Sequence, residues 1–542
     1  MFARVLIMTA LMVPFCSFST VVSLDASAQT EQEGAVEQLS VEKMIHYPTV
    51  IDQLYQSTNY RLNWENESDV EQFIFQMKLV ALADVSKEFD NQLHRINQVR
   101  WKGDNLDFDL VMTDSLLMYL SYLEQVPQEG VNWLFANKAH VSFPAPSVDT
   151  LSVLSNEITV GKLDQFLASL RSPLQKDASF NTVFASLSEF SQYQYPFYEQ
   201  KGLLRIGDPI ENKSTLVERM AIVGVDVSYI DSEIPQYDEN LELAVKEFQR
   251  IHGLNQDGVI GPNTIRWINF SPQQRLHLLA LNAERSRIWA KERDNVVFVN
   301  VPGYEVTYWH DGQPLFESKV VVGRASRKTP IMTGTLDSVI LNPTWNVPWK
   351  IMVKDIIPKV KRNPMYLMEH NIQIIRSWTS REIIDPTTIN WATVNPRTFP
   401  YRMRQASGSH NALGLYKFNM PNPQAIYLHD TPSKNLFQQD RRAFSSGCVR
   451  VENADQLAEL LFKTQGLEER LEKKRESARS STTSVPLGER IPVHIIYQTA
   501  WLEEGTLYYR DDIYKYDHQA KPAWLVNLRK FTILKNCFLF NK

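Results

Sequence analysis

The spacing of apolar positions divides the chain into a helical part and a later strand-like part. From residue 41 to about residue 200, apolar side chains recur every three or four positions, as at Leu116, Tyr119 and Leu123. This period is typical of amphipathic helices. No group of residues with catalytic character stands here, so we predict a helical scaffold over residues 40–204.

A second helical unit is predicted at residues 205–270. Leu241 and Val245 lie four positions apart and would share one helix face. Pro262 stands where a last helix would begin, and proline is favoured at the first helical position. We therefore predict three short helices, followed by a linking helix over residues 271–294.

The period changes at Asn295 to the alternation expected of β-strands. Asp311-Gly312 separates two such runs and predicts a tight hairpin turn. Strand-like runs stand at residues 296–299, 304–309, 316–322, 337–341, 425–429 and 493–499. These runs predict a β-rich domain over residues 295–500.

Two further segments lie within or after this domain. A proline- and tryptophan-rich stretch of mixed period at residues 345–400 is long enough to form a lid. The remainder, residues 501–542, is expected to be a C-terminal tail whose role the pattern does not indicate.

The first 28 residues have the features of a secretory signal peptide. Arg4 is followed by an apolar stretch, and Ala26-Ser27-Ala28 fits the small residues that precede a cleavage site. An uncleaved membrane anchor is the alternative, since the apolar stretch approaches spanning length. Contact with a membrane is expected only in that case. The net charge of −5 does not suggest nucleic-acid binding.

Candidate chemistry lies near the end of the β-rich domain. Of the three cysteines, Cys448 follows His429 by 19 residues, a loop long enough to bring the two side chains together. A thiol becomes a strong nucleophile when it is deprotonated, and a neighbouring imidazole promotes this. We therefore predict Cys448 as nucleophile and His429 as general acid and base.

The residues around Cys448 suggest supporting roles. Gly447 removes a Cβ from the approach path and would let backbone N–H groups face a developing oxyanion. Ser445 and Ser446 can fix the loop or meet the substrate, and Arg450 can either pin the loop or attract a substrate carboxylate. Tyr427 would share a face with the histidine if this segment is a strand, where it would either line the pocket or only pack.

Together these residues resemble the signature of the L,D-transpeptidase family: a histidine, a spacer, then Ser/Thr-x-Gly-Cys-hydrophobic-Arg/Asn. Here the signature runs from His429 to Ser445-Ser446-Gly447-Cys448-Val449-Arg450. Residues 320–330, 342–348 and 414–418 extend the match. The segment at 244–265 resembles a three-helix peptidoglycan-binding domain. The order of segments is similar to that of the large Gram-negative members.

The resemblance implies a multidomain α+β protein whose catalytic domain centres on a β-sandwich. It implies a periplasmic enzyme without a cofactor that acts on tetrapeptide stems of peptidoglycan as donor and acceptor. Cys448 would form a thioester with the donor stem, and the acceptor amine would resolve it into a 3→3 cross-link between diaminopimelate residues. Carbapenems and other β-lactams would acylate Cys448.

Two departures from smaller family members concern the site. Asp430 stands where many have glycine, and Ser446 where many have histidine, so the group that orients His429 is open; a backbone carbonyl of the loop is one possibility.

Other functions remain open. The same fold could serve a carboxypeptidase or endopeptidase that uses water as acceptor, or a non-catalytic wall-binding protein in which Cys448 pairs with Cys537. A Ser-x-x-Lys match at 40–43 lacks the companion motifs of penicillin-binding enzymes, and no zinc-peptidase motif occurs.

Overall fold

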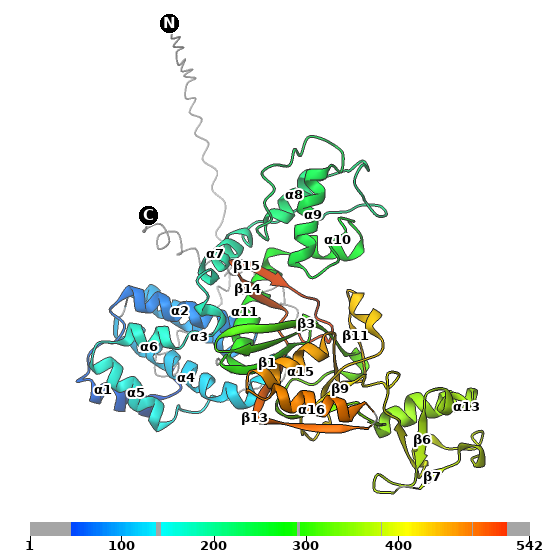
Figure 1. Ribbon diagram of the computed structural model, residues 1–542. Coiled ribbons are helices and arrows are strands. Elements are labelled where there is room, and N and C mark those ends of the chain that lie inside the picture. The colour runs from blue at the N-terminus through cyan, green and yellow to red at the C-terminus, as the bar shows by residue number, and fades with distance from the viewer. Residues whose placement is uncertain are drawn as a thin grey trace, which may run out of the picture. The chain divides into compact units, whose positions relative to one another are not determined.

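The computed structural model describes residues 45–103, 105–136, 143–289, 293–380, 382–479 and 481–517 (Figure 1). The predicted signal peptide, Cys16, Cys537 and the tail beyond residue 517 lie outside these residues. Within them, no helix combines the length and apolar character needed to cross a bilayer.

Helices make up the described chain before residue 200. Asn66, Ser86 and Ser147 each precede a helix and accept a hydrogen bond from its first turn, which fixes where it begins. The helices are α1 (Pro48–Ser57), α2 (Glu67–Leu82), α3 (Lys87–Lys102), α4 (Asn105–Ala136), α5 (Val148–Thr159), α6 (Leu163–Ser169) and α7 (Phe180–Phe190).

Three helices follow, α8 (Lys213–Ala221), α9 (Glu239–Ile251) and α10 (Pro262–Ile268). Next comes α11 (Pro272–Arg285), which begins with a capping box between Ser271 and Gln274. α11 is buried along most of its length because it contacts α2, α4 and α7 on the scaffold side and the later strand β14. The segment predicted as a linker is thus a central packing element.

The strands of the main sheet hydrogen-bond in the order β11-β3-β12-β10-β9-β4-β13-β1-β2, and β2 also pairs with β3. They are β1 (Asn295–Asn300), β2 (Glu305–His310), β3 (Gln313–Gly323), β4 (Met332–Leu341), β9 (Tyr416–Asn419), β10 (Leu428–His429), β11 (Ala443–Ser445), β12 (Val449–Val451) and β13 (Thr483–Ile496). The hairpin predicted at Asp311-Gly312 joins β2 and β3, with both turn residues at positive φ.

The layers predicted as a sandwich belong to one sheet that closes on itself. This closure arises because β3 pairs with different strands along its length. Residues 313–319 pair with β2, residues 320–321 with β12 and residues 322–323 with β11. Helices α15 (Ala454–Lys463) and α16 (Glu468–Ala478) pack against this sheet, α15 on β3 and β9 and α16 on β4 and β13 (Figure 1).

The segment between β4 and β9 forms a unit with its own core. A four-stranded sheet in the order β5-β8-β6-β7 pairs Trp345–Asn346, Arg402–Gln405, Ile372–Ile375 and Ile383–Ile384. It packs with α12 (Trp349–Ile351), the π-helical turn η5 (Met352–Ile356), α13 (Ile357–Arg362) and α14 (Tyr366–Glu369).

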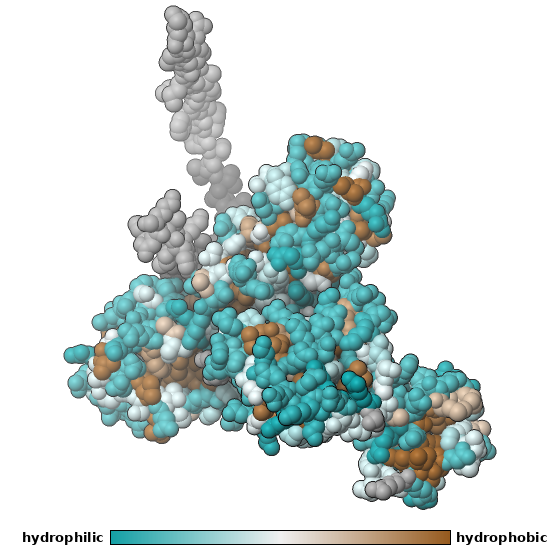
Figure 2. Space-filling view, viewed as in Figure 1, coloured by the Kyte–Doolittle hydropathy of each residue, from teal (hydrophilic) through white to brown (hydrophobic). Residues whose placement is uncertain are grey.

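This insertion also presents apolar side chains to solvent, and Figure 2 shows apolar surface gathered over it. The exposed large side chains are Trp349, Met365, Met368, Trp378 and Ile383.

The chain after residue 500 differs from the predicted tail, because residues up to 517 are folded. β14 (Ala500–Glu503) and β15 (Thr506–Tyr509) form a hairpin. Residues 510–517 then pack through tyrosines, with Tyr514 and Tyr516 against Tyr497. We call residues 510–517 the C-terminal strap.

Candidate active site

Strand pairing brings the predicted site residues to one face of the sheet. β10 and β12 run parallel with His429 opposite Arg450, and the Val449 N–H donates to the Tyr427 carbonyl at 3.1 Å. Paired residues share a face and neighbours along a strand alternate. Four predicted side chains therefore share this face: Tyr427, His429, Cys448 and Arg450.

His429 is buried and held by backbone. Its Nδ1 lies 2.5 Å from the carbonyl oxygen of Asp430, which requires a proton on Nδ1 and leaves Nε2 free to accept one. The orienting group is thus a loop carbonyl. Burial first, then the positive charges of Arg450 and Lys417, lower the pKa of His429 to about 3, so the imidazole is neutral near pH 7.

Within the described part of the chain, Cys448 forms no disulfide, and its side chain is only partly exposed. Its Sγ lies 3.8 Å from the carbonyl oxygen of Ala425. Burial raises the pKa of this thiol, while hydrogen bonds from the backbone and side chain of Tyr427 and the charges of Lys417 and Arg450 act in the opposite direction. The resting site therefore combines a protonated thiol with a neutral imidazole.

Tyr427 connects these two groups. Its ring meets the His429 ring edge-on at 5.6 Å between centroids, and its hydroxyl interacts with Cys448 and with the side chain of Trp345 from the insertion. The structure thus places Tyr427 in the site beside the sulfur.

The loop before Cys448 is held by side-chain to backbone hydrogen bonds. The Ser445 hydroxyl donates to the Cys448 carbonyl at 2.6 Å and accepts from the Gly447 N–H at 3.1 Å. Gly447 has φ +123°, a conformation that favours glycine. Because its N–H is engaged within the loop, the predicted oxyanion role of Gly447 does not fit this structure; the next amide, that of Cys448, is the alternative.

Ser446 faces the insertion rather than the sulfur. Its hydroxyl is 2.9 Å from Arg327 Nη1, and Arg327 forms a two-pronged ion pair with Asp355 of η5, with 2.9 Å between Nη2 and Oδ1. The hydroxyl that we predicted to meet substrate instead joins the cysteine loop to the insertion.

Arg450 has donor capacity left for a ligand. Its Nε is buried and has no hydrogen-bond partner among the described residues. Burial lowers the pKa of Arg450 and the Cys448 sulfur raises it. A buried guanidinium N–H without an acceptor suits a substrate carboxylate.

Lys417 is a site residue that sequence reasoning missed. It lies on β9 directly opposite His429, and its Nζ stands 4.5 Å from the centroid of the Tyr427 ring. Its segment, residues 414–418, was part of the family match. Only the strand register shows that this lysine faces the histidine and cysteine.

The side chain of Asp430 is itself fixed by hydrogen bonds and so helps to position His429. One carboxylate oxygen accepts the Leu415 N–H at 2.9 Å and the other lies 2.7 Å from Lys434 Nζ. A Cβ on Gly414 would come within 2.2 Å of Asp430 Oδ2, so glycine is required there. Aspartate in place of the glycine of smaller members thus fixes the carbonyl that orients His429.

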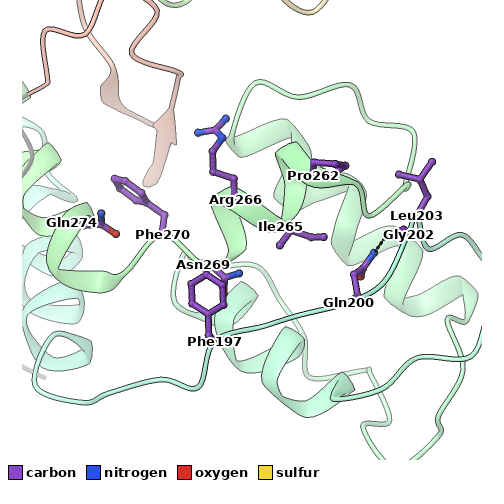
Figure 3. Close-up of a pocket in the computed structure, with 10 residues that line it drawn as sticks. All are labelled: Phe197, Gln200, Gly202, Leu203, Pro262, Ile265, Arg266, Asn269, Phe270 and Gln274. Atoms are coloured by element: carbon purple, nitrogen blue, oxygen red, sulfur yellow. Dashed lines mark hydrogen bonds between the residues drawn. The ribbon is translucent and has the colours of Figure 1, made fainter.

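A surface groove lies elsewhere, between residues 197–203 and the α10–α11 region (Figure 3). Phe197, Leu203 and Ile265 give it apolar walls. The side chains of Gln200 and Asn269 are engaged in hydrogen bonds within the protein. None of the predicted site residues lines this groove, and no cluster of three potential metal ligands occurs in the described chain.

Comparison with known proteins places these features in a family. The model described as "L,D-transpeptidase catalytic domain" matches residues 294–465, "Putative peptidoglycan binding domain" matches 219–268 and "Scaffold domain" matches 49–176. A protein of Haemophilus influenzae named "Putative L,D-transpeptidase" is 31% identical over 479 residues, which cover 88% of this chain and 80% of that protein.

Solved structures give weaker matches. An L,D-transpeptidase from Stackebrandtia nassauensis is 14% identical with a TM-score of 0.21, and the match covers 58% of this chain and all of that one. One from Xylanimonas cellulosilytica is 13% identical with a TM-score of 0.18, covering 55% and 100%.

The sequence relationship and the three matched domains establish that this chain belongs to the L,D-transpeptidase family.

Proposed function

We propose that this protein is a periplasmic enzyme that forms 3→3 cross-links between diaminopimelate residues of peptidoglycan stems, with Cys448 as nucleophile. The observation that supports this most is the shared face of β10 and β12, where the thiol, the neutral His429 and the unsatisfied Arg450 stand together.

The proposed reaction has two acyl-transfer steps. The Cys448 sulfur attacks the carbonyl at the L-centre of the donor diaminopimelate while its proton passes to His429 Nε2. The carbon–nitrogen bond to the terminal D-alanine then breaks, the leaving amine takes the proton from His429, and a thioester remains. Cys448 N–H is the proposed oxyanion donor, since Gly447 N–H is engaged by Ser445.

In the second step the side-chain amine of an acceptor diaminopimelate attacks the thioester. His429 accepts the amine proton and returns it to the sulfur, which leaves as the new amide forms. We propose Arg450 as the partner of a stem carboxylate in both steps.

The insertion at residues 345–400 is proposed to act as a lid over the stems, so that the amine competes with water. Its exposed apolar side chains and its contacts with the cysteine loop through Asp355 and Arg327 support this. Substituting Asp355→Asn should raise the fraction of hydrolysed product; an unchanged ratio of dimer to shortened monomer would contradict the lid.

Export to the periplasm is proposed from the N-terminal signal features, and the segment at 219–268 is proposed to contact the wall. Fractionation of cells that produce the full chain tests the first point. Recovery in the cytoplasm would contradict it.

Product analysis separates transferase from hydrolase. Purified protein with disaccharide-tetrapeptides should yield cross-linked dimers and free D-alanine. Shortened monomers alone would favour the hydrolase.

Thiol labelling of native protein addresses the wall-binding alternative: a reactive thiol that disappears in Cys448→Ala excludes the Cys448–Cys537 bridge.

β-Lactams should acylate the same sulfur, because their strained amide is open to attack by a thiolate. Intact-protein mass spectrometry after exposure to meropenem is expected to show one adduct on the wild type and none on Cys448→Ala.

A further inference from the structure

A lysine without an assigned role stands in the middle of the site. Lys417 on β9 pairs in register with His429 on β10 and, on its other side, with Ile340 on β4. Its Nζ lies over the Tyr427 ring, which meets the His429 ring edge-on, while the hydroxyl of Tyr427 interacts with Cys448. Lys417 is partly buried, so its charge acts in a region with reduced screening.

The charged groups around the sulfur come from several elements. β9 supplies Lys417 and β12 supplies Arg450, while β10 supplies His429 and Tyr427. Burial lowers the pKa of Lys417, while the Cys448 sulfur and Asp337 of β4 act in the opposite direction. Burial and the charge of Arg324, which follows β3, lower the pKa of Arg450.

These positive charges have opposite effects on the two reacting groups. They favour a thiolate at Cys448 and disfavour an imidazolium at His429. By strand register, Lys417 on β9 and Arg450 on β12 lie on either side of His429, so fixed positive charge stands beside the reacting pair. These cations add to the countercharge that the imidazolium supplies once His429 has taken the proton from the sulfur.

We propose that Lys417 remains protonated and, together with Arg450, provides the positive charge that stabilises the Cys448 thiolate as it forms. Sγ–H breaks, His429 Nε2–H forms, and Lys417 keeps its own protons throughout. This inference deepens the proposed function and rests on it for its role in acyl transfer, but it concerns the thiol before any substrate binds.

Two other roles for Lys417 would have different consequences. A neutral lysine could act as a base toward the acceptor amine, and an arginine could not replace it, because arginine stays protonated. A lysine that only packs on Tyr427 could be replaced by methionine without change in the thiol.

The test is the rate of Cys448 alkylation by iodoacetamide from pH 6 to pH 10, followed by intact mass on the full chain without substrate. Lys417→Met should move the apparent thiol pKa up by about one unit and slow alkylation at pH 7 about tenfold. Lys417→Arg should restore the wild-type profile. Lys473→Met, at a mostly exposed lysine on α16, is the matched control and should change nothing.

A Lys417→Met profile that superimposes on the wild type would overturn the proposal, as would Lys417→Arg reacting as slowly as Lys417→Met. Thermal melting checks that each variant is folded, and Lys417→Gln provides a second neutral variant if methionine disturbs the sheet. Failure of the wild type to cross-link stems would remove the proposed function, whereas the alkylation profiles still decide the role of Lys417.

Discussion

At the scale of single residues, the site depends on the hydrogen bonds that fix the orientation and the tautomer of His429. The Asp430 carbonyl fixes the proton on Nδ1, and the Asp430 side chain is fixed in turn by Leu415 N–H and Lys434. The imidazole can then accept a proton only at Nε2.

Gly414→Ala should destabilise the protein and reduce activity. The alanine would adopt φ +61° and its Cβ would meet Asp430 Oδ2, so strain and collision combine. Gly505→Ala is the control, because Gly505 has φ +79° with no atom near its Cβ. Chemical denaturation should show a loss of about 1–2 kcal/mol for the control, from the left-handed backbone alone, and more for Gly414→Ala. Equal losses would contradict the role given to Asp430.

The buried His429 should make stability depend on pH. Its pKa is about 3 when folded and about 6.5 when unfolded, so below pH 6.5 the unfolded chain binds a proton that the folded chain does not. The corresponding stability is complete above pH 6.5 and is lost as the pH falls toward 3. Urea denaturation at pH 7 and pH 4.5 should show a smaller loss for His429→Gln than for wild type. The same loss in both would mean that the imidazole is solvated.

At the scale of elements, residues outside the catalytic signature motif hold the loop that carries Cys448. The Thr329 hydroxyl donates to the Gly447 carbonyl at 2.8 Å. Tyr514 of the C-terminal strap accepts the Thr329 N–H at 2.9 Å and donates to the Gly323 carbonyl at 2.6 Å. A segment predicted as a tail therefore supports the loop that presents Cys448.

Tyr514→Phe should cost about 1–3 kcal/mol, because two buried backbone groups lose their partner. It should also slow meropenem acylation of Cys448, since Thr329 would hold Gly447 less firmly. Tyr308→Phe, which loses hydrogen bonds to Asn295 and Thr464, is the control. It should leave the acylation rate unchanged. Acylation of Tyr514→Phe at the wild-type rate would show that the strap does not position the loop.

Local patterns and motifs predicted the family and several of the elements. The hairpin at Asp311-Gly312 and the shared face of Tyr427 and His429 follow from turn residues and alternation. The position of Lys417 in the site and the closure of the sheet could not be predicted. Both depend on strand register, which links positions far apart in the chain. The engagement of Ser446 by Arg327 likewise depends on how the insertion packs.

At the scale of the whole molecule, α11 and the C-terminal strap connect scaffold and catalytic domain. Arg285 is fully buried and donates to Asp517 at 2.6 Å, to the Tyr516 carbonyl at 2.9 Å and to the Leu134 carbonyl at 3.1 Å. Its guanidinium also lies 4.4 Å from the centroid of the Phe135 ring. One side chain thus joins α4, α11 and the strap.

Arg285→Met should destabilise the protein by about 3–5 kcal/mol, because the mostly buried carboxylate of Asp517 would lose its countercharge. The double variant Arg285→Met/Asp517→Asn should recover part of this loss in chemical denaturation. A double variant no more stable than the single one would show that the charge of Asp517 is not the cause.

The central claim, that Cys448 forms an acyl-enzyme with the donor stem under the control of His429, is tested most directly by mass spectrometry. Purified protein is mixed with disaccharide-tetrapeptide, quenched in acid and mapped by peptide. The account predicts an adduct equal to the donor minus D-alanine on the peptide that contains Cys448, strongly reduced in His429→Ala and absent in Cys448→Ala. An adduct on another residue, or cross-linked product from Cys448→Ala, would contradict it.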